Sequence, residues 1–402
     1  MEKDDRMGFA MRKWTVFLWL FAAVLPVRAQ MIRTATFNCS LTRSKAGGLI
    51  EDLRGGQNPQ GKAVAEILQR VRPDVVLLNE FDWDAEGRGI GIFQKEYLEI
   101  SQSGQEPLVY PFVFTGPVNT GLASGIDLDG DGRTDGPEDA FGYGRFEGQY
   151  GMVLLSRFPI RKEAVRTFQT FLWKDMPGAL LPKKPGAEKE MWYSPEVLER
   201  LRLSSKSHWD VPVEVHGRVI HFLASHPTPP VFDGAEDRNG RRNHDEIRFW
   251  ADYLTKDKSG YIYDDASRRG GLEEGAFFVI LGDLNADPQD GDGLHEGILS
   301  LLHHPRVQDV RPASKGAAEA ARLDGGVNEG HKGPAELDTY QSPPGRQPGN
   351  LRLDYVLPSK ELKVIKAEVF WPERADPLSR LTAGPPYVSS DHRLVWADLE
   401  LP

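Results

Sequence analysis

The stretch Val279 to Pro288 reads VILGDLNADP, and it sets polar side chains directly after a short apolar run. The apolar run, which two phenylalanines precede, is typical of a buried strand. Gly282 allows the backbone to turn tightly where that strand ends. We therefore expect Asp283 and Asn285 side by side at the mouth of a sheet, where open α/β folds bind their ligands. The alternative is an ordinary strand that ends in an Asx-rich turn.

The composition is that of a globular protein, with 402 residues of which 40% are hydrophobic and 27% are charged. No composition break divides the chain after its N-terminal segment, so residues 30–402 are predicted to form one large domain. The net charge of -10 argues against nonspecific electrostatic binding of nucleic acid, although it does not exclude a local basic cleft. Cys39 is the only cysteine, which excludes an intramolecular disulfide.

The N-terminal residues 1–29 are predicted to be a secretory signal peptide. Arg12 and Lys13 precede an apolar run at 14–27, and Val27-Arg28-Ala29 is a small-x-small cleavage pattern. The run is short for a membrane span, so we expect cleavage, export to a periplasmic or extracellular location, and no transmembrane span in the mature chain. The alternative is an apolar N-terminal helix. Nothing in the sequence indicates a protein partner.

Several other predicted strands also end at polar side chains. Strands are expected at residues 32–37, 74–78, 149–159, 211–215, 219–224, 352–357 and 394–399, and helices at 62–70 and 244–254. The polar residues at or beside strands are Asn38, Glu80, His226, Asp283, Asn285, Asp354, Asp391 and His392. Each alone has an ordinary structural explanation, but hard oxygen ligands combined with two histidines suit a Mg²⁺ or Mn²⁺ site for hydrolysis. The sequence has no zinc-ligand spacing, no G-x-S-x-G elbow and no phosphate-binding P-loop.

Residues 127–138 read DLDGDGRTDGPE and match the twelve-residue calcium loop D-x-D-x-D-G-x5-E. The predicted Ca²⁺ ligands are the carboxylates of Asp127, Asp129, Asp131, Asp135 and Glu138 and the backbone carbonyl of Arg133. So many like charges repel one another without a cation, although a solvated acidic loop is the alternative. Glycine-rich flanks indicate a lone structural loop rather than a helix–loop–helix hand.

A basic segment, DRNGRR at 237–242, follows His226 along the chain. Its arginines, Arg238, Arg241 and Arg242, are candidates for binding a substrate phosphate because guanidinium groups match phosphate oxygens in pairs. The segment is equally compatible with a solvated loop before the helix at 244–254. Residues 172–194 are predicted to be a surface excursion, and residues 291–349 are loop-rich.

Taken in order, the motifs TFN, LLNE, GMVLLSR, SHP, GDLNAD, RLDYVL and SSDH resemble those of the endonuclease/exonuclease/phosphatase superfamily. That group includes pancreatic-type deoxyribonucleases, abasic-site endonucleases, neutral sphingomyelinases and inositol-polyphosphate phosphatases. The resemblance covers residues 31–401. Any single motif is weak evidence, whereas the complete ordered set is specific.

The resemblance implies an α/β fold, a four-layer α/β/β/α sandwich of two mixed sheets with outer helices. It implies a role for each polar residue of the set. Asn38 and Glu80 would hold the catalytic Mg²⁺ or Mn²⁺, with Asp391 beside them. Asp283 would orient or deprotonate the attacking water, and Asn285 would bind a phosphoryl oxygen. His392 would pair with Asp354 and contact the phosphate, and His226 would stabilise the developing charge.

The predicted function is therefore that of an exported, divalent-metal-dependent phosphoester hydrolase, a phosphodiesterase or phosphomonoesterase acting on small or lipid-derived phosphates. A secreted nuclease of the same fold is the first alternative. A catalytically idle, calcium-stabilised binding protein is the second, and the presence of every expected site residue argues against it. The proline-rich segment at 225–233 and the calcium loop depart from the superfamily pattern, so the substrate stays open.

Overall fold

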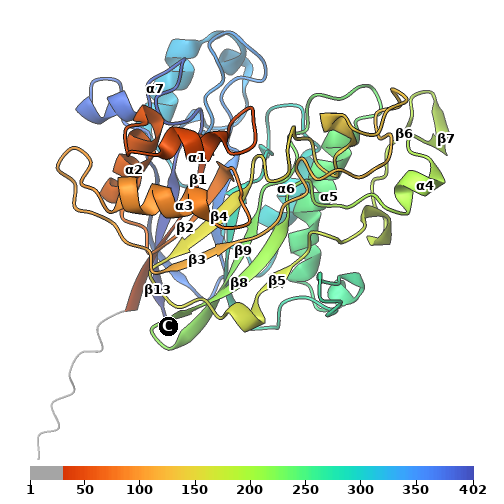
Figure 1. Cartoon of the computed structure of the whole chain (residues 1–402), viewed down its shortest axis with the longest axis horizontal. Coiled ribbons are helices and arrows are strands. Elements are labelled where there is room, and N and C mark those ends of the chain that lie inside the picture. The colour runs from red at the N-terminus through yellow and green to blue at the C-terminus, as the bar shows by residue number, and fades with distance from the viewer. Residues whose placement is uncertain (1–29) are drawn as a thin grey trace, which may run out of the picture.

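The computed structural model describes residues 30–402, and the predicted signal peptide at 1–29 lies outside them. Two mixed sheets pack face to face, one of six strands in the order β12-β13-β1-β2-β4-β3 and one of five in the order β11-β10-β9-β8-β5 (Figure 1). Helices cover both outer faces. The predicted four-layer α/β/β/α sandwich is confirmed.

Each sheet has one parallel pair of strands within an otherwise antiparallel arrangement. The pairs are β1 with β2 and β9 with β10. The first sheet contains β12 (Lys363–Val369), β13 (Val395–Leu401), β1 (Gln30–Leu41), β2 (Val75–Phe81), β4 (Met152–Ser156) and β3 (Phe112–Thr115). The second contains β11 (Asp354–Pro358), β10 (Phe277–Asp283), β9 (Arg218–Ser225), β8 (His208–Val215) and β5 (Arg166–Thr167). A separate hairpin joins β6 (Lys183–Lys184) and β7 (Ala187–Met191).

The central strands are apolar on both faces because each sheet is covered on both sides. Successive side chains of a strand point to opposite faces. On β2, Val75 and Leu77 therefore enter the core between the sheets, while Val76 and Leu78 pack under the outer helices. The run VIL in β10 divides in the same way. This double burial explains why these strands read as continuous apolar runs rather than as alternating patterns.

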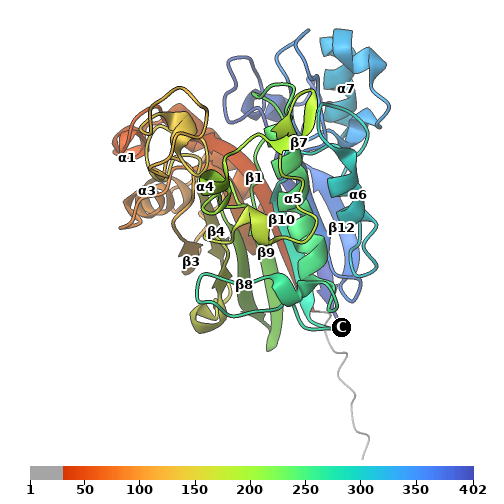
Figure 2. The same cartoon turned by 90° about the vertical axis from the view of Figure 1, so that its right-hand side faces the viewer.

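The outer layers are amphipathic helices that bury one face. Helices α1 (Gly48–Leu53), α2 (Pro59–Val71) and α3 (Arg88–Phe93) cover the first sheet, and α5 (Arg238–Tyr253) and α6 (His295–Leu302) cover the second (Figure 2). The start of α2 is capped, because the Asn58 side chain accepts a hydrogen bond from the Gly61 N–H and Pro59 occupies the first turn. The remaining helices are α4 (Pro195–Leu198) and α7 (Lys315–Asp324).

Two segments differ from the sequence-based prediction. Helix α5 begins at Arg238 rather than at residue 244, so the predicted arginine turn forms the first turns of a helix. The segment at 172–194 is only partly a surface excursion, because Trp173 and Met176 are buried in the outer core of the second sheet. Among residues 30–402, no helix combines the length and the apolar character that crossing a membrane requires.

Gly282 has a different role from the predicted turn. It lies inside β10, and a Cβ atom at this position would stand 2.1 Å from the carbonyl oxygen of Ser225 on β9. Its φ of 156° is also rarely adopted by residues that have a side chain. Glycine thus permits the close approach of β9 and β10 directly before Asp283.

Candidate active site

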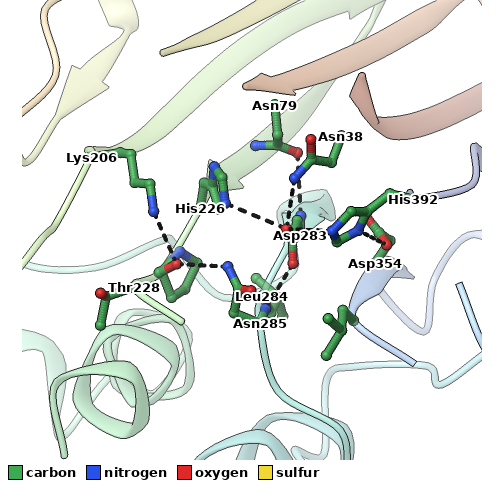
Figure 3. A network of polar contacts seen from close by, with 12 residues as sticks. Asn38, Asn79, Lys206, His226, Thr228, Asp283, Leu284, Asn285, Asp354 and His392 are labelled. Carbon is green, nitrogen blue, oxygen red and sulfur yellow. Dashed lines mark hydrogen bonds and ion pairs between the residues drawn. The ribbon is translucent and has the colours of Figure 1, made fainter. Parts of the chain in front are cut away.

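The two sheets meet through polar side chains at the ends of their central strands. Asn38 lies in the last part of β1, and Asp283 is the final residue of β10. The Asn38 Nδ2 donates a hydrogen bond of 2.9 Å to Asp283 Oδ2, which joins the two sheets (Figure 3). Because β1 and β2 are parallel, Asn79 and Glu80 reach the same edge from the neighbouring strand.

The carboxylate of Asp283 is the centre of this network and is 1% exposed. Its Oδ1 accepts a hydrogen bond of 2.9 Å from the Asn285 N–H, and its Oδ2 lies 3.4 Å from His226 Nε2 and 3.7 Å from His392 Nε2. Burial alone would raise the pKa of Asp283, but the positive charge of His392 and the hydrogen bond from His226 lower it well below its usual range. Asp283 is therefore ionised at neutral pH.

His392 forms an ion pair with Asp354. The His392 Nδ1 lies 2.8 Å from Asp354 Oδ2, and the hydroxyl of Thr339 donates a hydrogen bond of 2.7 Å to the same oxygen. Burial opposes the charge on the ring, but the carboxylates of Asp354 and Asp283 together raise the pKa of His392 to about 10. Burial raises the pKa of Asp354 to about 6. At neutral pH the ring is thus a cation held by an anion.

His226 stays neutral beside the same carboxylate. It follows β9 directly, is 2% exposed, and its Nδ1 has no hydrogen-bond partner among the described residues. Burial and the positive charge of Lys206 lower the pKa of His226 to about 4. The two histidines around Asp283 therefore differ, since His392 carries a proton on both nitrogens and His226 on one.

A candidate metal centre lies beside this network. Burial and the charge of Asp391 raise the pKa of Glu80 to about 7, so the two carboxylates repel each other. Glu80 also has a φ of 55°, in the left-handed region that non-glycine residues adopt infrequently. A divalent cation would offset this repulsion, and the oxygen donors of Asn38, Glu80 and Asp391 are those that Mg²⁺ and Mn²⁺ prefer. The residues present fit the predicted metal.

A second group of possible ligand atoms coincides with the ion pair. One atom from each of Asp283, Asp354 and His392 lies within 4.8 Å of the others. The ion pair with Asp354 raises the pKa of His392 to about 10, which favours the protonated ring in the metal-free protein. The roles that the sequence predicts for these three residues, in proton transfer and contact with the phosphate, stay predictions.

Asn285 stands next to the carboxylate in a turn. Its φ of 51° places it in the left-handed region, which asparagine tolerates better than most residues. Its Nδ2 donates a hydrogen bond of 3.1 Å to the carbonyl oxygen of Pro227, the residue after His226. The structure thus places both the carboxamide of Asn285 and the carboxylate of Asp283 at the end of β10, as the sequence predicts, although the assigned roles stay predictions.

The three predicted phosphate-binding arginines lie at the start of α5. Arg242 donates hydrogen bonds to the carbonyl oxygens of Leu203, Phe141, Arg202 and Ser204. Arg238 pairs with the Glu236 carboxylate, and Arg241 donates to the Glu236 carbonyl oxygen at 3.2 Å. These contacts hold the start of α5 against neighbouring loops. A role in binding phosphate stays a prediction for all three.

The acidic loop at 127–138 gathers a ligand group that differs from the predicted one. Possible ligand atoms of Asp127, Asp129 and Asp139 lie within 4.8 Å of one another. Asp139, which is 2% exposed, stands one residue beyond the predicted loop, and Glu138 does not belong to the group. The Arg133 guanidinium pairs with Asp135 at 2.9 Å. Calcium binding here stays a prediction.

Sequence reasoning missed two residues of the network. Thr339 fixes Asp354 from a position 15 residues earlier in the chain, and Lys206 reaches the site from just before β8. No motif marks either residue, because both belong to segments without a recognisable pattern. Thr339 contacts Asp354 and Lys206 contacts Pro227, and each pair is separated in the sequence, so these contacts become evident only in the folded chain.

A model of the Endonuclease/Exonuclease/phosphatase family matches residues 35–392 of this chain. The protein belongs to this family. The superfamily resemblance predicted from the motifs is thereby confirmed, and the matched segment contains every residue of the network from Asn38 to His392. A search of curated proteins finds no match.

Solved structures with a similar chain trace include a protein titled as a member of this family and proteins with other names. One is an endonuclease/exonuclease/phosphatase from Beutenbergia cavernae DSM 12333, with 18% identity, a TM-score of 0.47, and coverage of 92% of this chain and 72% of that one. A second is beta toxin from Staphylococcus aureus, with 14% identity, a TM-score of 0.46, and coverage of 91% of this chain and 99% of that one. A third is sphingomyelinase C from Streptomyces griseocarneus, with 16% identity, a TM-score of 0.45, and coverage of 92% of this chain and 99% of that one.

Proposed function

We propose that this protein is a divalent-metal-dependent phosphoester hydrolase in which water attacks phosphorus in line with the leaving group. The observation that carries the proposal is the arrangement around Asp283, whose Oδ2 lies 3.4 Å from His226 Nε2 and 3.7 Å from His392 Nε2. An ionised carboxylate lies between a protonated His392 and a neutral His226. Such a set can take a proton from water and stabilise a negatively charged transition state at the same time.

Each residue then has a distinct task. Asp283 holds the attacking water and accepts its proton as the new P–O bond forms. His392, kept cationic by Asp354, donates a hydrogen bond to a non-bridging oxygen, where negative charge develops. The P–O bond to the leaving group breaks, and the departing oxygen takes a proton from solvent. A Mg²⁺ or Mn²⁺ held by Asn38, Glu80 and Asp391 would neutralise phosphoryl charge as a Lewis acid.

The proposal extends to substrate, location and the second ion. The net charge of -10 favours small or lipid-derived phosphates over nucleic acid, because a nucleic-acid backbone is bound through many positive charges. The signal-like N-terminus supports export to a periplasmic or extracellular site. The loop at 127–138 is proposed to bind a structural Ca²⁺, separate from the catalytic ion.

The test is a substrate panel with defined metals. A bis-aryl phosphate, an aryl phosphate, DNA, RNA and sphingomyelin are each assayed with Mg²⁺, Mn²⁺ or Ca²⁺, and with chelator. Metal-dependent turnover of a small or lipid-derived ester is expected. Turnover of DNA or RNA alone would establish the nuclease alternative. Absence of turnover on every substrate with every metal would contradict the proposed activity.

A further inference from the structure

Lys206 is a buried lysine whose ammonium group lacks a strong partner. Its side chain is 6% exposed, and its Nζ lies 3.4 Å from the carbonyl oxygen of Pro227. Figure 3 shows the side chain pointing toward the network of His226, Asp283 and Asn285. A contact of this length is near the limit of a hydrogen bond. Two of the three ammonium hydrogens therefore remain available for another acceptor.

No carboxylate among residues 30–402 lies within 4 Å of this ammonium group to form an ion pair. Lysines are almost never this buried unless they are paired. Burial lowers the pKa of Lys206, and the carboxylates that act on it from a distance are those of Glu246, Glu80 and Asp283. The ammonium group of Lys206 is thus removed from water, and no carboxylate of the described residues balances its charge at contact distance.

Glu246 does not explain Lys206, because neutral donors already satisfy its carboxylate. The Glu246 Oε1 accepts hydrogen bonds of 2.6 Å from the Ser205 N–H and 3.0 Å from the Ser205 hydroxyl. Its Oε2 accepts one of 2.7 Å from the Thr228 N–H. These bonds fix the backbone at Ser205, directly before Lys206, and at Thr228, directly after Pro227. They support the position of the lysine without neutralising it at contact distance.

The carbonyl oxygen of Pro227 receives two donors from the network. Asn285 Nδ2 donates to it at 3.1 Å, and Lys206 Nζ donates at 3.4 Å. The cationic ammonium and the carboxamide therefore stand at the same place, on the side of Asp283 that His226 and Asn285 share. An anionic oxygen bound there would receive charge-assisted hydrogen bonds, which are shorter and stronger than a bond to a neutral carbonyl.

We propose that Lys206 binds a non-bridging phosphoryl oxygen of the substrate, together with Asn285, and so holds phosphorus in front of Asp283. The inference rests on the proposed phosphoester hydrolysis and adds a substrate-binding cation to it. The phosphoryl group would then be held between His392 and Lys206, two cations that reach the site from segments just before β13 and just before β8. Lys206 contacts the oxygen that stays on phosphorus, not the oxygen that leaves.

The direct test measures inorganic phosphate binding to the full protein in Mg²⁺ by calorimetry. Lys206→Met keeps the length of the side chain and removes its charge, and Lys363→Met is the matched control, because Lys363 is an exposed lysine on β12 that pairs with Glu400. The phosphate Kd should rise on the order of 10- to 100-fold in Lys206→Met, as expected for one lost charge-assisted hydrogen bond, and stay unchanged in the control. Equal Kd values in wild type and Lys206→Met would overturn the proposal.

Turnover separates this role from two others. With aryl phosphates of graded leaving-group pKa, the loss of kcat/KM in Lys206→Met should be the same for good and poor leaving groups. A loss confined to poor leaving groups would mean that the lysine protonates the departing oxygen. A change restricted to the acidic limb of the pH profile would mean that it acts only by keeping His226 neutral. Both results contradict phosphate binding.

Folding and the underlying function are checked in the same experiments. Lys206→Gln replaces Lys206→Met if the methionine variant does not reach the wild-type melting temperature. If the wild type binds phosphate but hydrolyses no ester, the proposed function fails while the phosphate Kd still tests the lysine. If the wild type hydrolyses esters and Lys206→Met matches it in Kd and rate, only the role of Lys206 fails. A wild type that does neither contradicts both.

Discussion

Replacing Asp354 by Asn should remove the charge that keeps His392 protonated. The two side chains lie 2.8 Å apart, and together with Asp283 this carboxylate raises the pKa of His392 from 6.5 to about 10. A histidine with a raised pKa is active in its charged form below that pKa and loses the charge as the pH rises through it. Wild-type activity should therefore persist to about pH 10, whereas the variant should lose activity at a lower pH.

The size of the loss follows from the fraction of protonated ring. If the pKa of His392 returned to 6.5, about 1% of the rings would be protonated at pH 8.5, a loss of roughly 100-fold from protonation alone. Misorientation of the ring adds to this, so we expect a total loss on the order of 10²–10⁴ at pH 8.5. The loss should shrink at pH 6, where the ring is mostly charged in both proteins.

The assay is kcat/KM on an aryl phosphate ester from pH 5.5 to 10 at saturating Mg²⁺. Thr339→Val is the matched control, because it removes a second hydrogen bond to the same Asp354 oxygen without changing any charge. It should lower the rate by less and leave the alkaline limb in place. If Asp354→Asn keeps both the wild-type rate and the wild-type pH profile, His392 does not act with Asp354.

Two further predictions concern the ions. Glu80→Ala should abolish turnover in Mg²⁺ and leave the protein folded, because it removes a proposed metal ligand and relieves repulsion from Asp391; near-wild-type turnover would disprove the assigned metal site. Calcium should raise the melting temperature, because binding to the folded loop raises the free energy of unfolding by about 2.7 kcal/mol at a hundredfold excess over Kd. Asp129→Ala combined with Asp131→Ala should remove that rise and retain activity in Mg²⁺ at moderate temperature. A double variant that keeps the full rise places the ion elsewhere, and one that folds but is inactive places the loop in the active site.

The sequence predicts the central part of this fold well, because the strands that build it are buried on both faces. The runs VVLL in DVVLL and VIL in VILG have no polar face, so each can be recognised as a buried strand from its own residues, without knowledge of the strands that pair with it. The edge strand β12 was missed, because only Val369 of the strand is buried and its sequence gives no continuous apolar run. Helices α6 and α7 were missed in a region dominated by glycine, proline and charge.

The candidate site was predictable where a residue follows a strand and not where it depends on a distant contact. Asp283 and His226 follow directly from apolar runs. Lys206 and Thr339 were not predicted, because their roles depend on Pro227 and Asp354, which come close only in the folded chain. The arginine segment differs from its prediction in conformation only: the expected turn forms the start of α5, where Arg242 donates hydrogen bonds to backbone carbonyl oxygens, and its role in binding phosphate stays a prediction.

The measurement that tests the central claim most directly is hydrolysis of the preferred ester in ¹⁸O-labelled water, with and without divalent metal. Attack of water on phosphorus places one ¹⁸O atom in the phosphate product and none in the alcohol. We predict this pattern only in the presence of Mg²⁺ or Mn²⁺, with turnover lost in Asp283→Asn because the variant cannot accept the proton of the water. Label in the alcohol, turnover in chelator equal to that with metal, or an Asp283→Asn variant as fast as wild type would contradict the account.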